Sequence, residues 1–228
     1  MTRRLTVVWD DPRPFATRGG RPIRILAASD EPDPTLDHAS NRAALGPLDL
    51  ILGCGDLTPE SLAFLGDAFP GPLLFVRGNH DRRGPWPRPE AIPVPSAGVD
   101  RRTIAAVSLL ALPWPDRDGG GLPDPVARRD EGRAWRQVLG HLGPHLLAPR
   151  RRAWIVFSHV PPRGVGDAPD DPYHLGFAAY RFALDRLRPR LWLHGHTTRA
   201  SQRNPVVEHG PTTVINVSGS VLVELRPG

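Results

Sequence analysis

The chain has 228 residues, with 29 basic and 24 acidic side chains and a formal net charge of +5, and every basic side chain is Arg. This length is sufficient for one domain with its own hydrophobic core, so we expect a single domain over residues 1–228. A single cysteine, Cys54, excludes an intrachain disulfide, no apolar run is long enough to span a membrane, and the apolar stretch near the start is too short for a signal peptide.

These features predict a cytoplasmic protein with no membrane partner. The basic excess raises the question of nucleic-acid binding. However, Arg and acidic residues are interspersed along the sequence, with no long basic stripe. We therefore do not expect a nucleic-acid partner, and a GC-rich genome is the simpler explanation for the abundance of Arg.

The first part of the chain alternates apolar runs with polar turns. Residues 10–21, rich in Pro, Arg and Gly, are expected to form a loop, and Pro59–Phe69 has the apolar spacing of a helix. Four apolar runs have the length and continuity of buried strands: Leu5–Trp9, Ile23–Ser29, Leu48–Leu52 and Leu73–Val76. The repeated alternation of strands with polar turns is typical of βαβ units in an α/β fold.

The second part of the chain continues this alternation. Ile104–Leu112 is expected to be one long strand, followed by a helix over Asp130–Leu147. The next expected elements are a strand over Trp154–Phe157, a helix over Phe177–Leu187 and a strand over Leu191–Leu193. Near the end, Thr212–Val217 and Ser220–Leu225 are expected to form a closing hairpin around Gly219.

Short polar motifs follow five of the expected strands, in one order along the chain. They are Asp30, Gly55-Asp56, Gly78-Asn79-His80-Asp81, Ser158-His159 and Gly195-His196. Because ligands of α/β proteins bind at the carboxyl ends of strands, we expect these side chains to lie close together. Carboxylate, amide and imidazole groups suit Mn²⁺, Fe, Zn²⁺ or Mg²⁺. The neighbouring Cys54 is expected to be a small buried residue.

This ordered series resembles that of the calcineurin-like metallophosphoesterase superfamily, over roughly residues 23–218. The resemblance implies an α/β fold with two mixed β-sheets packed as a sandwich and flanked by helices, in four αββα layers. It also implies metal-dependent hydrolysis of a phosphoester, either a phosphodiester or a small phosphomonoester. Because no cap or DNA-binding domain is evident, the expected partner is a small phosphorylated substrate.

The resemblance assigns metal-binding roles by position. Asp30 would bind the first of two metal ions, and Asp56 would bridge both. The second metal site would be completed by Asn79, His159 and His196. The expected cofactor is a divalent metal, with manganese first and iron, zinc and magnesium as alternatives, bound as one or two ions.

The resemblance also assigns catalytic roles. A metal-activated water would attack phosphorus in line. His80 would act on the leaving group or a phosphate oxygen, as an acid or as an electrostatic stabiliser. Asp81 would either orient His80 or cap a turn.

Two positions depart from the family pattern. The family has His where this chain has Pro32 and Thr198, and both missing histidines would serve the first metal. Glu31 or Asp33 could supply a replacement carboxylate. If neither does, the alternative function is a catalytically weak or inactive phosphate- or nucleotide-binding regulatory protein with one metal.

Three further side chains are candidates for substrate binding. Arg163 lies just beyond a predicted ligand, and Arg199 follows the broken last motif. Either could bind a substrate phosphate or simply be a solvated surface residue. His174 could reach the site from the loop after His159 or lie near a helix start. His194 is expected to be structural, because alternation along the strand turns it away from the side that His196 faces.

Overall fold

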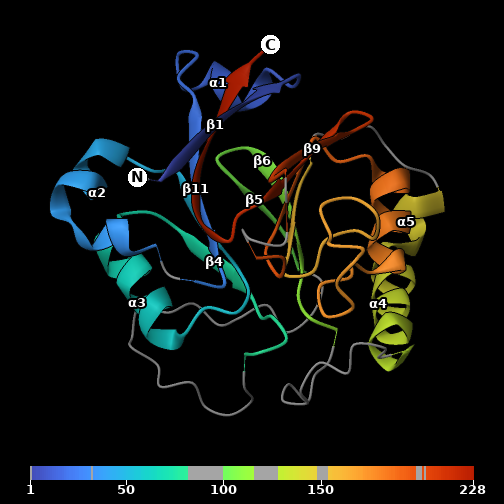
Figure 1. Cartoon of the computed structure of the whole chain (residues 1–228). Helices are drawn as coiled ribbons and strands as arrows, with labels where there is room; N and C mark the ends of the chain where they lie inside the picture. The colour runs from blue at the N-terminus through green and yellow to red at the C-terminus, as the bar shows by residue number, and fades with distance from the viewer. Residues whose placement is uncertain are drawn as a thin grey trace.

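Two mixed β-sheets face each other, and helices cover both outer faces (Figure 1). The computed structural model describes residues 2–31, 33–81, 100–115, 128–147, 154–198, 202 and 204–228. This arrangement confirms the α/β sandwich that the motif series implied.

The first sheet has the strand order β1-β11-β2-β3-β4. Its strands are β1 (Arg3–Trp9), β11 (Gly219–Pro227), β2 (Ile23–Ser29), β3 (Leu50–Cys54) and β4 (Leu73–Val76). β2, β3 and β4 are parallel to one another, whereas β11 runs antiparallel to β2 and parallel to β1. The carboxyl ends of β2, β3 and β4 therefore lie at one edge of the sheet.

The second sheet has the strand order β5-β6-β7-β8-β10-β9. Its strands are β5 (Asp100–Ile104), β6 (Val107–Leu112), β7 (Trp154–Ser158), β8 (Leu191–His194), β10 (Thr212–Asn216) and β9 (Val206–His209). The four central strands are parallel, and β5 and β9 are antiparallel edge strands.

Helices form the two outer layers. They are the 3₁₀ helix η1 (Pro34–Asp37), α2 (Ala39–Leu45), α3 (Pro59–Ala68), α4 (Arg128–Leu147) and α5 (Ala178–Leu187). The short helix α1 (Arg13–Ala16) lies outside these layers, and its Phe15 packs in the core between the sheets. Figure 1 shows α2 and α3 on the side of the first sheet and α4 and α5 on the side of the second. Among the helices of the described residues, none is long and apolar enough to cross a membrane.

Alternation of side chains explains the layers. In β2, Ile25 and Ala27 belong to the core between the sheets, whereas Leu26 packs with residues of α3 on the outer face. In β6, Leu109 faces the other sheet, and Leu110 packs with residues of α4 and α5. Because both faces of the parallel strands are buried, these strands read as continuous apolar runs in the sequence.

The long strand expected over Ile104–Leu112 is wrong. The chain forms two antiparallel strands, β5 and β6, that are joined by a tight turn at Ala105 and Ala106. Both turn residues have positive φ, 51° and 63°, a conformation that Gly, Asn or Asp usually supply in hairpins. Two alanines give no turn signal, and their apolar side chains made the segment look continuous.

The expected closing hairpin is also wrong. β10 lies in the second sheet and β11 in the first, so the chain crosses between the sheets at Val217 and Ser218. β10 pairs instead with β8 and β9, and the strand β9 was not anticipated. The segment 10–21, expected to be a loop, contains the short helix α1, and η1 and α2 were likewise missed.

Candidate metal centre

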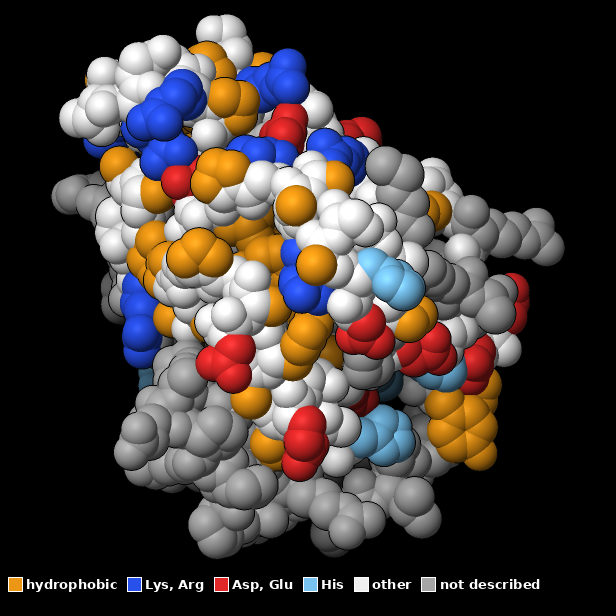
Figure 2. Space-filling model, turned by 90° about the vertical axis from the view of Figure 1, so that its left-hand side faces the viewer, with side chains coloured by type: hydrophobic (Ala, Val, Ile, Leu, Met, Phe, Trp, Pro, Cys, Tyr) orange, Lys and Arg blue, Asp and Glu red, His pale blue; other side chains and the backbone are white. Residues whose placement is uncertain are grey.

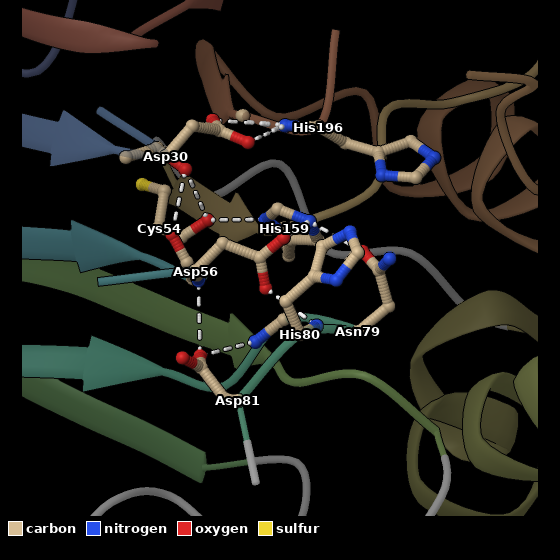
Figure 3. A network of polar contacts seen from close by, with 12 residues as sticks. Asp30, Cys54, Asp56, Asn79, His80, Asp81, His159 and His196 are labelled. Atoms are coloured by element: carbon tan, nitrogen blue, oxygen red, sulfur yellow. Dashed lines mark hydrogen bonds and ion pairs between the residues drawn. The ribbon is translucent and has the colours of Figure 1, made fainter. Parts of the chain in front are cut away.

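The five predicted ligands all lie where a strand ends. Asp30, Asp56 and Asn79 follow β2, β3 and β4 of the first sheet, and His159 and His196 follow β7 and β8 of the second. Figure 3 shows these side chains gathered at the common edge of the two sheets. The sandwich therefore collects residues that are as many as 166 positions apart in sequence.

His159 is at the centre of the group. Its Nε2 lies 3.1 Å from Asp56 Oδ2 and 2.8 Å from Asn79 Oδ1, and its ring centroid lies 5.1 Å from that of His196. The Nδ1 of His159 lies 3.0 Å from the carbonyl oxygen of Cys54. When Nδ1–H donates to that carbonyl, the lone pair of Nε2 points at the two oxygen ligands, as in metal-bound histidines.

Asp30 joins this group from the other side. Asp30, Asp56 and His159 each offer a ligand atom, and these three atoms lie within 4.8 Å of one another. Carboxylate, amide and imidazole donors at such separations fit a divalent metal ion of the Mn²⁺, Fe, Zn²⁺ or Mg²⁺ type. The thiol of Cys54 is buried, and burial raises its pKa, so it remains protonated.

Three of the ligands have a left-handed backbone: φ is 61° at Asp30, 54° at Asp56 and 67° at His196. Each such residue costs about 1–3 kcal/mol and persists only where its surroundings hold it. The backbone N–H of Asp30 donates to Gly55, that of Asp56 to the Asp81 carboxylate, and that of His196 to the Asp30 carboxylate. The ligand turns are thus locked to one another.

Glycines of the motifs leave room for the ligands. A Cβ at Gly195 would lie 1.9 Å from Ser29 Oγ and 2.5 Å from Asp30 Oδ2, and a Cβ at Gly78 would lie 2.2 Å from Asp56 Oδ1. These distances are too short for any side chain, so both positions need glycine for close approach.

Asp81 holds two of the ligand turns. Its Oδ2 accepts from the backbone N–H of Gly78 at 2.7 Å and from that of Asp56 at 2.9 Å. Burial, together with the negative charge of Asp56, raises the pKa of Asp81 to about 6. The hydrogen bond from the backbone N–H of Gly78 acts in the opposite direction and lowers this pKa. Of the two roles considered for Asp81, these contacts match the turn cap.

The side chain of His80 is exposed, and its backbone N–H donates to Asp56 Oδ1 at 2.9 Å.

The electrostatics favour a cation at His159. Burial alone would lower the pKa of His159, but the negative charge of Asp56 raises it to about 9. In turn, burial would raise the pKa of Asp56, but the charge of His159 lowers it to about 2. The carboxylate of Asp56 thus favours a proton on His159, and a metal ion that binds Nε2 has to displace that proton. Burial and the charge of His159 lower the pKa of His196 well below its usual value, so His196 is a neutral donor.

The position that the resemblance assigns to the first metal has fewer candidate ligands. Both carboxylate oxygens of Asp30 accept from the backbone N–H of His196, and Oδ2 lies 2.9 Å from the Ser218 hydroxyl. Thr198 is exposed, and Pro32 lies outside the described residues. Among the described residues, no further His, Cys, Asp or Glu joins the close group of Asp30, Asp56 and His159.

Neither proposed replacement carboxylate enters that group. Asp33 caps η1 by accepting from the backbone and hydroxyl of Thr35, and it also accepts from the hydroxyls of Ser220 and Thr2. Glu31 is exposed. The carboxylate of Asp33 is therefore committed to the start of η1.

The substrate-binding candidates have different surroundings. Arg163 donates to the carbonyl of Gly176 at 2.8 Å and to Glu131 at 3.4 Å, so its guanidinium is engaged within its own loop and with α4. His174 lies beside the site, with its ring centroid 5.4 Å from that of His196. Arg199 lies outside the described residues.

His194, expected to be structural, is fully buried. Its Nδ1 lies 2.9 Å from the carbonyl oxygen of Gly195, and burial lowers its pKa to about 4. A neutral, enclosed imidazole at this position supports the strand end without facing the ligands.

Sequence reasoning missed three residues of this region. The carboxylate of Asp171 holds Nδ1 of His174 at 2.6 Å, Ser218 contacts Asp30, and the ring of Trp114 lies 6.3 Å from that of His196. The spacing of Asp171 and His174 and the position of Trp114 after an apolar run were visible signals. Ser218 gave none, because its approach to Asp30 depends on the unexpected crossing between the sheets.

Comparisons with known proteins agree with this geometry. The sequence model of one family, described as calcineurin-like phosphoesterase, matches residues 29–199. Comparison with curated proteins gives no match. One crystal structure aligns with a TM-score of 0.56 and 15% identity, covering 87% of this chain and 91% of that chain.

Two named structures also align. A dimetal phosphatase from Danio rerio gives a TM-score of 0.50 and 12% identity, covering 87% of this chain and 88% of that chain. Vps29 from Entamoeba histolytica, complexed with Zn²⁺, gives a TM-score of 0.43 and 13% identity, covering 86% of this chain and 74% of that chain. At this level of sequence identity, the similarity to the phosphatase indicates a shared fold and nothing more.

Proposed function

This chain belongs to the calcineurin-like phosphoesterase family, and on that premise we propose that it hydrolyses a phosphoester with the help of a divalent metal ion. The observation that carries the proposal is the convergence of Asp56, Asn79 and His159: Nε2 of His159 lies 3.1 Å from Asp56 Oδ2 and 2.8 Å from Asn79 Oδ1. The proposed substrate is a small phosphorylated molecule, a phosphomonoester or a phosphodiester.

Four side chains would hold the ion: Asp56, Asn79, His159 and His196. When bound, a divalent cation lowers the pKa of a water molecule and neutralises charge on the phosphate. The mixture of oxygen and imidazole donors supports manganese as the first candidate, with iron, zinc and magnesium as alternatives.

His80 is proposed as the proton donor to the leaving group. Its backbone is tied to Asp56 by a 2.9 Å hydrogen bond, which fixes its Cα next to the ligands. Its side chain is exposed and can therefore turn towards an ester oxygen and protonate it as the bond to phosphorus breaks.

His174 is proposed to contact the substrate from the side of His196. The carboxylate of Asp171 lies 2.6 Å from Nδ1 and fixes the orientation of the ring. When the imidazole carries a second proton, Nε2–H is then left to donate to a phosphate or ester oxygen.

We propose that one ion is bound rather than two. The carboxylate of Asp30 is already supplied with donors by Ser218 and His196, and Thr198 is exposed. The same observation favours a second candidate function: a phosphate- or nucleotide-binding regulatory protein with little or no turnover.

Hydrolysis is tested with purified protein supplied in turn with manganese, iron, zinc and magnesium. p-Nitrophenyl phosphate and its bis-ester are the substrates, and circular dichroism confirms folding. We expect activity that is lost in His159→Gln and kept in His38→Gln, which changes an exposed His outside the site. Folded protein without activity under all four metals would overturn the hydrolase proposal and leave the binding protein.

The number of ions is tested by elemental analysis of the loaded protein. We expect one ion per chain in the wild type. Thr198→His restores the family residue at the first site and is expected to add binding of a second ion. Two ions in the wild type would contradict the one-metal proposal, whereas unchanged stoichiometry in Thr198→His would show that position 198 is not what limits the first site.

A further inference from the structure

An aromatic side chain borders the candidate metal centre. Trp114 lies just beyond the end of β6, and its backbone N–H donates at 2.9 Å to the carbonyl of Arg77, which precedes the Gly78 turn. Its ring lies 5.4 Å from Phe177 and 6.3 Å from His196. Trp114 is thus fixed from both its backbone and its ring, and it remains partly exposed.

The loop that approaches His196 offers acids rather than cations. Residues 159–177 contain Asp167, Asp170 and Asp171, and Arg163, the one Arg among them, is engaged by Glu131 and a backbone carbonyl. A substrate with several phosphates would meet repulsion here, because each additional phosphate needs its own cationic partner.

Most Arg side chains on the face shown in Figure 2 lie away from the candidate metal centre. On the face in Figure 2, most of them gather towards the upper end, where Figure 1 places α1 and β1, and the His side chains lie lower. The carboxyl end of β2 points away from that upper end, because β2 runs antiparallel to β11, which ends there. The described Arg side chains of this face are therefore poorly placed to attract a polyanion to the metal centre.

We infer that Trp114 is a specificity-determining residue that packs against a planar aromatic ring carried by the phosphate compound. This inference rests on the proposed phosphate-binding site and names its substrate class: a compound with one phosphate and an aromatic ring close to it. The ring of Trp114 supplies a flat apolar surface beside His196, where aromatic stacking adds affinity without requiring charge.

The test measures binding rather than turnover. Phenylphosphonate and methylphosphonate differ in the ring alone and are not phosphate esters, so their dissociation constants can be measured by titration calorimetry on manganese-loaded protein. We expect the wild type to bind phenylphosphonate about tenfold more tightly, because its ring can stack on that of Trp114. Trp114→Ala should reduce this ratio to below about twofold, and Trp114→Phe should keep most of it.

A matched control removes another aromatic pair. Trp135→Ala deletes an indole on α4 that packs against Phe182 at 5.3 Å, and it should leave the ratio unchanged even if stability falls. A wild type without preference for the phenyl compound, or a Trp114→Ala variant with an unchanged ratio, would overturn the inference. Because the ratio needs no hydrolysis, an inactive protein with an intact ratio would refute the hydrolase proposal alone.

Two sources of the aromatic ring can be distinguished by competition. Adenosine 5′-monophosphate and ribose 5-phosphate differ by the base, which is separated from the phosphate by the sugar. If Trp114→Ala removes a preference for the nucleotide as well, the proposed ring includes nucleobases. If the effect is confined to phenylphosphonate, the proposed ring is attached directly to the phosphate group.

Discussion

At the scale of single residues, Gly195 shows how tightly the turns that carry the predicted ligands are packed. We expect Gly195→Ala to lower the free energy of unfolding by about 1–3 kcal/mol and to weaken metal binding, because the new Cβ displaces Ser29 or Asp30. Urea denaturation and metal titration measure the two effects.

The control for this substitution is Gly140→Ala. Gly140 is exposed on α4, and a Cβ there meets nothing within 4 Å. Alanine should therefore stabilise the helix by about 0.5–1 kcal/mol. Equal effects of the two substitutions on stability would show that crowding around Gly195 does not cause the loss expected for Gly195→Ala.

The buried carboxyl of Asp81 gives the site a pH dependence. An Asp carboxyl in the unfolded chain titrates near 3.8 and that of folded Asp81 near 6, so the folded state keeps the proton longer. Stability from this group therefore falls as the pH rises from about 4 to 6. Asp81→Asn keeps an acceptor for Gly78 and Asp56 without the charge. We expect the Asp81→Asn variant to become more stable than the wild type as the pH rises from about 4 to 6. Above about pH 6, the difference in the free energy of unfolding should reach about 1–3 kcal/mol.

Thermal unfolding of metal-free protein between pH 4 and 8 measures this difference. Asp37→Asn serves as the control for the loss of one carboxylate, because Asp37 is exposed on η1. If Asp81→Asn is less stable than wild type at pH 8, the charged carboxylate is needed for its two hydrogen bonds and the expected sign is wrong.

Glu131 joins two helices at the scale of elements. Its carboxylate, from α4, accepts from the backbone N–H of Ala178 and Ala179, the first two residues of α5. It therefore caps a helix of another segment, as an N-cap side chain would. We expect Glu131→Ala to cost about 0.5–2 kcal/mol in the free energy of unfolding, and Glu131→Gln less.

The exposed Glu60, in the first turn of α3, provides the comparison. Glu60→Ala should cost at most about 1 kcal/mol, because it interacts with its own helix dipole alone. Hydrogen exchange of α5 amides resolves where the loss occurs. Unchanged protection of α5 in Glu131→Ala would argue against a capping role.

Metal binding should act on the whole molecule, because Asp56 and Asn79 come from one sheet and His159 and His196 from the other. A ligand that binds the folded state stabilises it by about 2.7 kcal/mol at a free concentration one hundred times its dissociation constant. We expect manganese to raise the melting temperature in a single transition. Asp56→Asn should abolish the shift, and a shift confined to one of two transitions would contradict coupling between the sheets.

The sequence was sufficient for the features that depend on local pattern. Buried parallel strands read as apolar runs, and each predicted ligand follows one, so the position of Asp30 or His159 could be foreseen. Tertiary choices could not be foreseen. The positive φ of Ala105 and Ala106 has no residue-type signal. The partners of β10 and β11 depend on a crossing at Val217 and Ser218, and that crossing also brings Ser218 to Asp30.

The position of β11 has a consequence for synthesis on the ribosome. The last described strand lies between β1 and β2, the first two, and β1 has no other strand partner in its sheet. Until residues 219–227 have left the exit tunnel, the edges of β1 and β2 are unpaired, and such edges invite pairing with other chains. The nascent protein should therefore depend on chaperones until β11 has paired with β1 and β2.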